Sequence, residues 1–310
     1  MTRDPGCCAH IAVALVLAKN CVNPPSSVPF GWLLRWKRRP PCAAFSLCAT
    51  GPTIPLRTIV YVDGYNLYYG RLTGTDHKWL DVVHLVESLV VGRSTDDEVV
   101  KVCYFTAPVL ARFARRGKDS VSAQNAYHAA LEYRHGDRFE KICGSHQAST
   151  DRMMRVVAGQ QPDHDDRVEV WRLNEKQTDV NIAVRMYRDA VRGACEQMVI
   201  CTNDTDAEPV LRVIREDYPR ITLGVIAPIR PIAPKAGSEV PRPMSSLRDC
   251  VHWSIPHITE AQLRAALMPE RIARQGRKPL LRPAHWAPAT QLAITEELAE
   301  PSVTPESERG

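Results

Sequence analysis

Thr58-Ile-Val-Tyr-Val62 is a short run of β-branched and aromatic residues, and Asp63 follows it directly. A continuous apolar run of this length is typical of a strand that is buried on both faces of a sheet. Four later segments read as further strands and are spaced along the chain: Val99–Phe105, Val168–Leu173, Met198–Cys201 and Thr222–Ile226.

Helical patterns separate these runs. Apolar residues recur three and four positions apart in four segments: Leu80–Val91, Ser122–Tyr133, Thr178–Val191 and Asp206–Asp217. In the third of these, one face carries Val180, Ala183, Val184, Tyr187 and Val191, an arrangement typical of a helix that packs one side on a core. The alternation of strands and helices predicts an α/β fold around a central parallel sheet of about five strands.

Composition divides the chain into four parts, at residues 1–56, 57–230, 231–286 and 287–310. We expect 1–56 to be disordered or to come from a start codon placed too far upstream, and a basic tail that assists RNA binding is the alternative. We expect 57–230 to form the α/β domain and 231–286 to pack on it as an extension. In that extension Thr259-Glu-Ala-Gln262 resembles a capping box that opens a short helix. The acidic, Pro- and Ser-containing tail is typical of a disordered segment.

Charge and cysteine content narrow the functional classes. The net charge of +5 lies in residues 1–56, which hold six basic residues and one acid, so 57–310 is neutral. Any basic surface of the domain must be local, and one candidate consists of Arg112, Arg115, Arg116 and Lys118. No apolar run reaches about 18 residues, so we expect no membrane span. Five scattered cysteines in residues 57–310 lack C-x-x-C pairs, which favours free thiols and a cytoplasmic location.

Aspartates follow the predicted strands. Asp63 comes after the first strand, Asp204 and Asp206 after the fourth, and Asp179 opens the helix after the third. Carboxyl ends of parallel strands share one edge of a sheet, so we expect these side chains to converge there. Such a cluster suits Mg²⁺ or Mn²⁺, which can activate water for phosphodiester hydrolysis. The alternative for each residue alone is a turn or helix-capping aspartate.

Three stretches resemble the motifs of the NYN domain family, a branch of the PIN-like nuclease superfamily. They are Val62-Asp-Gly-Tyr-Asn66, Glu175-Lys-Gln-Thr-Asp-Val-Asn181 and Thr202-Asn-Asp-Thr-Asp206, and their order and spacing also fit. The resemblance implies a PIN-like three-layer α/β/α fold. It also implies an endoribonuclease that depends on Mg²⁺ or Mn²⁺ and has RNA as its partner.

The resemblance also assigns roles to single residues. It implies that four aspartates bind metal and act in catalysis with Asn66: Asp63, Asp179, Asp204 and Asp206. The expected substrate-binding residues are Lys176, Thr202, Asn203, Arg112, Arg115 and Arg116, although Lys176 could equally be a solvated charge. Ala207 stands where the family usually has a bulky apolar residue, and Glu208 follows it. This departure puts the degree of activity in doubt.

Other interpretations stay open at this point. Ala207 favours a non-catalytic RNA-binding or regulatory protein on the same fold. A haloacid-dehalogenase-like phosphatase is less consistent, because Asp63 lacks a second aspartate two positions on. The glycines form no G-x-G-x-x-G pattern, which argues against a nucleotide cofactor. Tyr65, Tyr68 and Tyr69 are expected to pack at the rim of the sheet, with stacking on bases as the alternative. Self-association into a homo-oligomer is also left open.

Overall fold

The computed structural model describes residues 55–231 and 245–288. The interpretations of residues 1–54 and 289–310 made above fall outside the described residues.

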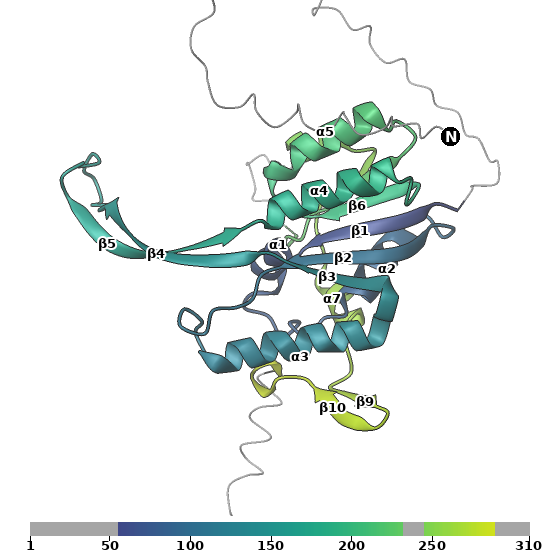
Figure 1. Cartoon of the computed structure of the whole chain (residues 1–310), viewed down its shortest axis with the longest axis horizontal. Coiled ribbons are helices and arrows are strands. Elements are labelled where there is room, and N and C mark those ends of the chain that lie inside the picture. The colour runs from purple at the N-terminus through teal and green to yellow at the C-terminus, as the bar shows by residue number, and fades with distance from the viewer. Residues whose placement is uncertain (1–54, 232–244, 289–310) are drawn as a thin grey trace, which may run out of the picture. The chain divides into compact units, whose positions relative to one another are not determined.

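A six-stranded parallel sheet forms the centre of the domain (Figure 1). Its order is β3 (Phe139–Cys143), β2 (Glu98–Thr106), β1 (Arg57–Asp63), β6 (Gln197–Cys201), β7 (Thr222–Ile226) and β8 (Trp253–Ile255). Every pairing within it is parallel. β1 lies between β2 and β6, and all its residues from Thr58 onward are buried, as its apolar sequence predicts.

Helices cover both faces of this sheet. One apolar core joins it to α2 (Val82–Val91), α3 (Lys118–His135) and α7 (Glu260–Ala265). The other core joins it to α4 (Thr178–Val191), α5 (Glu208–Asp217) and α6 (Ser245–Cys250). The prediction of a three-layer α/β/α fold with a central parallel sheet is therefore confirmed, with six strands where about five were expected.

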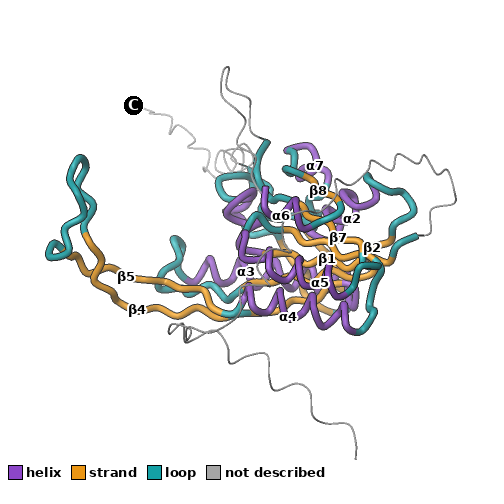
Figure 2. The backbone as a smooth tube through the Cα atoms, turned by 90° about the horizontal axis from the view of Figure 1, so that it is seen from above, coloured by secondary structure: helices purple, strands orange, loops and turns teal. Residues whose placement is uncertain are grey.

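The prediction that Val168–Leu173 is a strand of the central sheet is wrong. Val168–Leu173 lies in β5 (Arg167–Lys176), which pairs antiparallel with β4 (Ser145–Met154) in a separate two-stranded ribbon. The ribbon extends away from the central sheet (Figures 1 and 2). Its sequence explains this placement, because Val168, Val170 and Leu173 are interrupted by Glu169 and Arg172. Such alternation suits a solvated antiparallel strand, whereas buried parallel strands are apolar throughout.

Two strands of the sheet have no counterpart in the sequence interpretation. β3 takes the edge beside β2, where charged Glu140 and Lys141 obscure its apolar signal. At the other edge, β8 pairs with β7 and so brings residues from 245 onward into the sheet. A hairpin of β9 (Arg271–Arg274) and β10 (Arg277–Leu281) follows. The capping box at Thr259 and Gln262 is present at the start of α7, as predicted.

The outward face of α4 departs from expectation. The helix has the predicted bounds, but the residues that it buries in the core include Ile182, Met186 and Ala190. The stripe that the pattern singled out is largely exposed instead: Val180, Val184, Tyr187 and Val191. The helix thus has two apolar sides, and the sequence period alone cannot say which of them meets the sheet.

Among the described residues, no helix has the length and apolar character that crossing a membrane would require.

Candidate functional site

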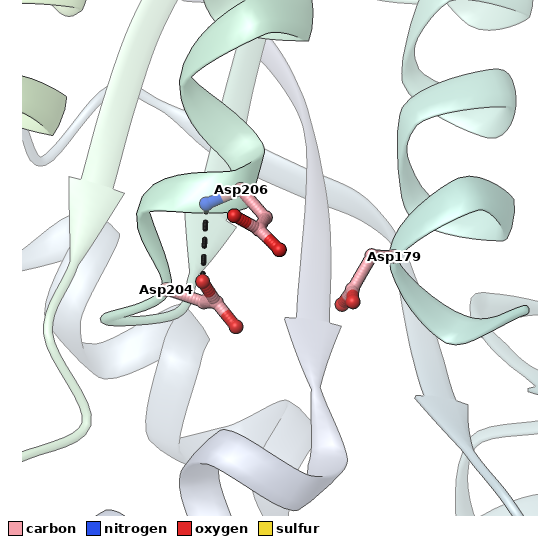
Figure 3. A group of neighbouring side chains, drawn as sticks. All are labelled: Asp179, Asp204 and Asp206. Carbon is pink, nitrogen blue, oxygen red and sulfur yellow. Dashed lines mark hydrogen bonds between the residues drawn. The ribbon is translucent and has the colours of Figure 1, made fainter. Parts of the chain in front are cut away.

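Three aspartates meet at the carboxyl edge of the sheet (Figure 3). Asp204 and Asp206 lie there because they follow β6, as predicted, whereas Asp179 follows β5, which is not a strand of this sheet. Carboxylate oxygens of Asp179, Asp204 and Asp206 all lie within 4.8 Å of one another. The three side chains come from the start of α4 and from the turn that links β6 to α5. Together with Asp63 they line a small cavity of about 10 Å³.

Asp63 is the buried member of this group, with an exposed fraction of 4%. Its carboxylate accepts hydrogen bonds from the Asn66 amide at 2.9 Å and from the Thr202 hydroxyl at 3.2 Å. Burial raises the pKa of Asp63, and the charges of Asp179 and Asp204 raise it further, against these two hydrogen bonds. Asp63 also caps the short helix α1 (Gly64–Leu67). Its aspartate character therefore has a structural reason as well as a chemical one.

Three other predicted site residues join the two loops at this edge. The Asn66 side-chain oxygen accepts a hydrogen bond from the Asn203 amide at 2.9 Å. The Thr202 hydroxyl, which donates to Asp63, accepts from the Asp204 amide at 3.1 Å. Through these hydrogen bonds Asn66 and Thr202 hold the loop after β1 against the loop after β6. The contacts described for them show no further role in a reaction.

Asp179 lies at this edge because it follows the end of β5, the second strand of the β4–β5 ribbon. β5 ends at Lys176, and Gln177 adopts a left-handed conformation, with a φ of 80°, that turns the chain into α4. Burial raises the pKa of Asp179, and Asp204 and Asp206 raise it further. Burial, followed by Asp179 and Asp63, raises the pKa of Glu175 to about 7. Glu175, whose pKa responds to Asp179 and Asp63, belongs to a predicted motif but was not predicted as a site residue.

None of the basic residues predicted to bind substrate lines the carboxylate cavity. Arg112 stacks on the Trp171 ring of the ribbon, 4.3 Å from its centroid. Lys176 is exposed at the end of β5. Arg115 and Arg116 line a second and much larger cavity.

This second cavity, the aromatic cavity, has a volume of about 930 Å³. It is bounded by α1 and the turn after it, by the end of β2, by α3 and by Trp286. Its aromatic side chains are Tyr65, Tyr68, Tyr69, Tyr104, Phe113, Tyr127, His128, His285 and Trp286. Lys78, Arg115 and Arg116 add positive charge to the lining. A large concave site with aromatic walls and a few polar groups is the usual form of a site for a small organic ligand.

A hydrogen-bonded chain ends inside the aromatic cavity. The Tyr65 hydroxyl lies 2.7 Å from Nε2 of His146, and Nδ1 of His146 lies 2.8 Å from the Pro108 carbonyl oxygen. Because a carbonyl can only accept, Nδ1 carries the proton and Nε2 is free to accept from Tyr65. Burial raises the pKa of Tyr65, and Tyr69 and Glu175 raise it further. The phenol is therefore neutral near pH 7 and has a proton acceptor behind it.

The deep wall of the aromatic cavity holds an unsatisfied polar atom. The Tyr127 hydroxyl is buried and has no hydrogen-bond partner among the described residues. Burial lowers the pKa of the neighbouring His128 to about 4, and Lys141 lowers it further, so this imidazole is neutral near pH 7. A buried hydroxyl without a partner costs free energy unless a ligand or water satisfies it.

Sequence reasoning missed this cavity because its walls come from distant segments. Tyr65, Tyr104, Tyr127 and Trp286 span more than 200 positions and share no motif. The one signal was the tyrosine group at 65, 68 and 69, whose alternative interpretation was ring stacking. The two sites are adjacent in the chain at one point, because Asp63 lines the carboxylate cavity and Gly64, the next residue, lines the aromatic cavity.

Comparisons with known proteins bear on the activity. The chain is 36% identical over 248 residues to the 6-hydroxy-3-succinoylpyridine 3-monooxygenase of Pseudomonas putida, across 75% of this chain and 76% of that protein. A solved protein of unknown function from Vibrio parahaemolyticus is 15% identical, with a TM-score of 0.35 over 68% of this chain and 97% of its own. That likeness is too weak to carry an argument. No family model matches the chain.

The similarity to a monooxygenase overturns four expectations. The endoribonuclease activity, its non-catalytic RNA-binding alternative, the hydrolase class and the Mg²⁺ or Mn²⁺ cofactor were wrong. The error has a physical source, because a parallel sheet gathers strand-end aspartates at one edge whatever reaction the protein performs. The resemblance to the NYN family, RNA as a partner and the roles of single residues stay predictions.

Identity at this level, over three quarters of both chains, leaves little room for coincidence of composition or fold alone. The chain belongs to the family of the 6-hydroxy-3-succinoylpyridine 3-monooxygenase of Pseudomonas putida.

Proposed function

We propose that this protein is a monooxygenase that acts on a hydroxylated pyridine, or a similar aromatic ring, with an acidic side chain. The observation that carries the proposal is the 36% identity to an enzyme named for such a reaction. We place the substrate in the aromatic cavity, which has the size and lining for it. A cytoplasmic location is part of this proposal.

The named substrate of the relative makes three demands on a binding site. Its pyridine ring is flat, its succinoyl group ends in a carboxylate, and its hydroxyl can lose a proton. Tyrosine rings such as Tyr65 and Tyr69, which stack with centroids 5.9 Å apart, suit the flat ring. Arg115 and Arg116 suit the carboxylate, because guanidinium groups bind carboxylates through two parallel hydrogen bonds.

Tyr65 and His146 suit the third feature of the substrate, a hydroxyl that can lose its proton. In 6-hydroxy-3-succinoylpyridine the hydroxyl at C6 is para to C3, the position named in the relative's activity. Removing the hydroxyl proton therefore raises the electron density at C3, the ring carbon that bears the succinoyl group. Oxygen from O₂ that bonds to C3 takes the place of this group. The C3–acyl bond breaks, water takes up the acyl group as a carboxylic acid, and the ring leaves as a dihydroxypyridine. The Tyr65 oxygen can accept this proton while its own proton passes to Nε2 of His146. The buried Tyr127 hydroxyl is free to donate to a polar atom of the ring or of the succinoyl group.

Monooxygenation also needs electrons. One oxygen atom of O₂ enters the substrate, and the other leaves as water after two electrons and two protons are taken up. A flavin or similar organic redox group, when bound, would carry these electrons to O₂. The aromatic cavity fits a planar group beside a substrate ring, since its 930 Å³ lie at the upper end of ligand-site volumes, about 300–1,000 Å³. Tyr68 and Tyr69 would hold such a group by stacking.

Oxygen consumption tests the proposal. The purified protein is given 6-hydroxy-3-succinoylpyridine, a flavin and a reduced nicotinamide as the electron source, and oxygen uptake is recorded with an electrode. We expect uptake that requires the protein and scales with the substrate. A matched run with nicotinic acid, which lacks both the hydroxyl and the succinoyl group, controls for uncoupled oxidation. Equal uptake with and without the substrate would contradict the proposal.

A further inference from the structure

The loop between β2 and α3, residues 107–117, forms one wall of the aromatic cavity. Five of its residues line the cavity: Val109, Phe113, Ala114, Arg115 and Arg116. The loop therefore carries both arginines that we assign to the carboxylate of the substrate. None of residues 108–117 is buried. A segment without a core of its own keeps its place only through contacts with neighbouring elements.

Three hydrogen bonds fix the start of this loop. The side-chain amide of Gln124 on α3 donates to the Ala107 carbonyl oxygen at 3.0 Å, and the side-chain oxygen of Gln124 accepts from the Val109 amide at 2.8 Å. Nδ1 of His146 donates to the Pro108 carbonyl oxygen from the other side. These bonds fix residues 107–109, which precede the turns that carry the two arginines.

Trp171 of the β4–β5 ribbon holds the middle of the loop. The guanidinium carbon of Arg112 lies 4.3 Å from the centroid of the Trp171 ring. The Phe113 ring meets the same indole edge-on, with a centroid distance of 5.4 Å. Two successive loop residues thus contact one side chain, only two positions before Arg115. A cation over an aromatic face and an edge-to-face ring pair are both stabilising arrangements.

The Trp171 ring does not belong to the core of the domain. Every residue of β5 is exposed or half-buried, and the ribbon pairs with no strand of the central sheet. Among the described residues, the ring contacts of Trp171 are those with Arg112 and Phe113. Its large side chain therefore stabilises the loop and not the packing of the helices on the sheet.

We propose that Trp171 is a positioning residue, which fixes this wall of the aromatic cavity and so determines the preference for a substrate with an acidic side chain. A guanidinium binds a carboxylate through two parallel hydrogen bonds, and this geometry tolerates a displacement of only about 0.5 Å. Arg115 and Arg116 meet that condition only while the loop is held. The preference for an acidic substrate rests on the proposed function, whereas the hold of Trp171 on the loop does not.

Limited trypsin digestion of the full chain tests the hold on the loop without any substrate. Trypsin cleaves after arginine, and Arg112, Arg115 and Arg116 are exposed. The two ring contacts of Trp171 together correspond to about a factor of ten in the opening equilibrium of the loop. We therefore expect Trp171→Ala to be cleaved at these sites about tenfold faster than the wild type, as mass spectrometry of the fragments would show.

Two further variants complete the digestion. Trp171→Phe keeps an aromatic face and should be cleaved at nearly the wild-type rate. Tyr133→Ala is the matched control, because Tyr133 is an aromatic residue of α3 that is 49% exposed and does not line the cavity. Equal cleavage rates for the wild type and Trp171→Ala would overturn the proposal.

Binding titrations test the consequence for specificity. Isothermal titration calorimetry compares 6-hydroxy-3-succinoylpyridine with 3-acetyl-6-hydroxypyridine, which keeps the ring, the hydroxyl and the ketone but lacks the carboxylate. We expect Trp171→Ala to weaken binding of the acid about tenfold and binding of the neutral ligand less than about twofold. An equal loss for both ligands would overturn the positioning role. A wild type that binds neither ligand would overturn the proposed function and the preference drawn from it, but not a hold on the loop that the digestion has shown.

Discussion

The carboxylate cluster and the aromatic cavity, which Asp63 and the next residue Gly64 line respectively, differ in how a sequence reveals them. The cluster consists of short motifs at strand ends, so its members can be selected from the amino-acid sequence alone. The cavity is assembled from rings that lie far apart in the chain, and its contents fit the chemistry of the monooxygenase relative. The site that is easier to predict from the sequence need not be the site at which the reaction takes place.

A substitution at Tyr65 is the strongest test of whether the aromatic cavity, and not the carboxylate cluster, is the reaction site. Tyr65→Phe keeps the ring but removes the hydroxyl that links the cavity to His146. We expect kcat to fall at least about 100-fold, the usual contribution of a positioned proton acceptor, with KM little changed. Steady-state kinetics between about pH 6 and 9 measure this. The residual activity should rise with pH, as the substrate hydroxyl ionises without assistance.

A companion variant separates the relay from simple packing. His146→Gln should lose a similar factor, and the double variant should be no slower than the slower single one, because both act on one proton. An unchanged kcat in Tyr65→Phe would show that the reaction does not use proton transfer from the substrate through Tyr65 to His146.

Arg115 and Arg116 should give the next largest effect. We expect Arg115→Gln with Arg116→Gln to raise KM about 10- to 100-fold and to leave kcat within a small factor. Hydrogen bonds to a charged group contribute about 1.5–3 kcal/mol, and each 1.4 kcal/mol is about a factor of ten in binding. Arg212→Gln, on the exposed face of α5, is the control. A change in kcat alone, with KM constant, would place these arginines elsewhere in the reaction.

Glu175 allows the carboxylate cluster to be tested through stability. Its pKa is about 7 in the folded protein and has an ordinary value of 4.5 otherwise, so the folded state retains a proton that the unfolded chain releases. Stability should therefore fall as pH rises from about 4.5 to about 7. Glu175→Gln removes this loss, so its melting temperature should exceed that of the wild type by more at pH 8 than at pH 5. An equal difference in melting temperature at every pH in this range would show that burial and the neighbouring carboxylates do not raise the pKa of Glu175.

Asp206 should give the smallest effect on turnover. It lies in the carboxylate cluster and is absent from the lining of the aromatic cavity. We expect Asp206→Asn to change kcat/KM by less than about threefold, because surface substitutions away from a reacting centre are nearly neutral. A loss of 100-fold or more would move the reaction from the cavity to the cluster.

The fold was largely predictable from sequence, and the site only in part. β1, β6 and β7 are apolar throughout, so their burial follows from composition. β3 escaped prediction because charged residues interrupt it at an edge, and Val168–Leu173 was misplaced because local propensity does not specify a strand's partner. The convergence of Asp63, Asp204 and Asp206 followed from strand order, whereas Asp179 reaches the same cavity from the end of the separate ribbon. The aromatic cavity could not be predicted in this way. The contact of Tyr65 with His146, for example, depends on where the β4–β5 ribbon lies relative to α1, which strand order does not determine.

Product mass after a reaction under ¹⁸O₂ tests the central claim most directly. The protein is incubated with 6-hydroxy-3-succinoylpyridine, a flavin and a reduced nicotinamide, and the mass of the dihydroxypyridine product, which has lost the succinoyl group, is measured by mass spectrometry. The account predicts a product that carries one ¹⁸O atom, formed by the wild type and by Asp206→Asn but only weakly by Tyr65→Phe. A product that takes its oxygen from labelled water, or no product from the wild type, would contradict it.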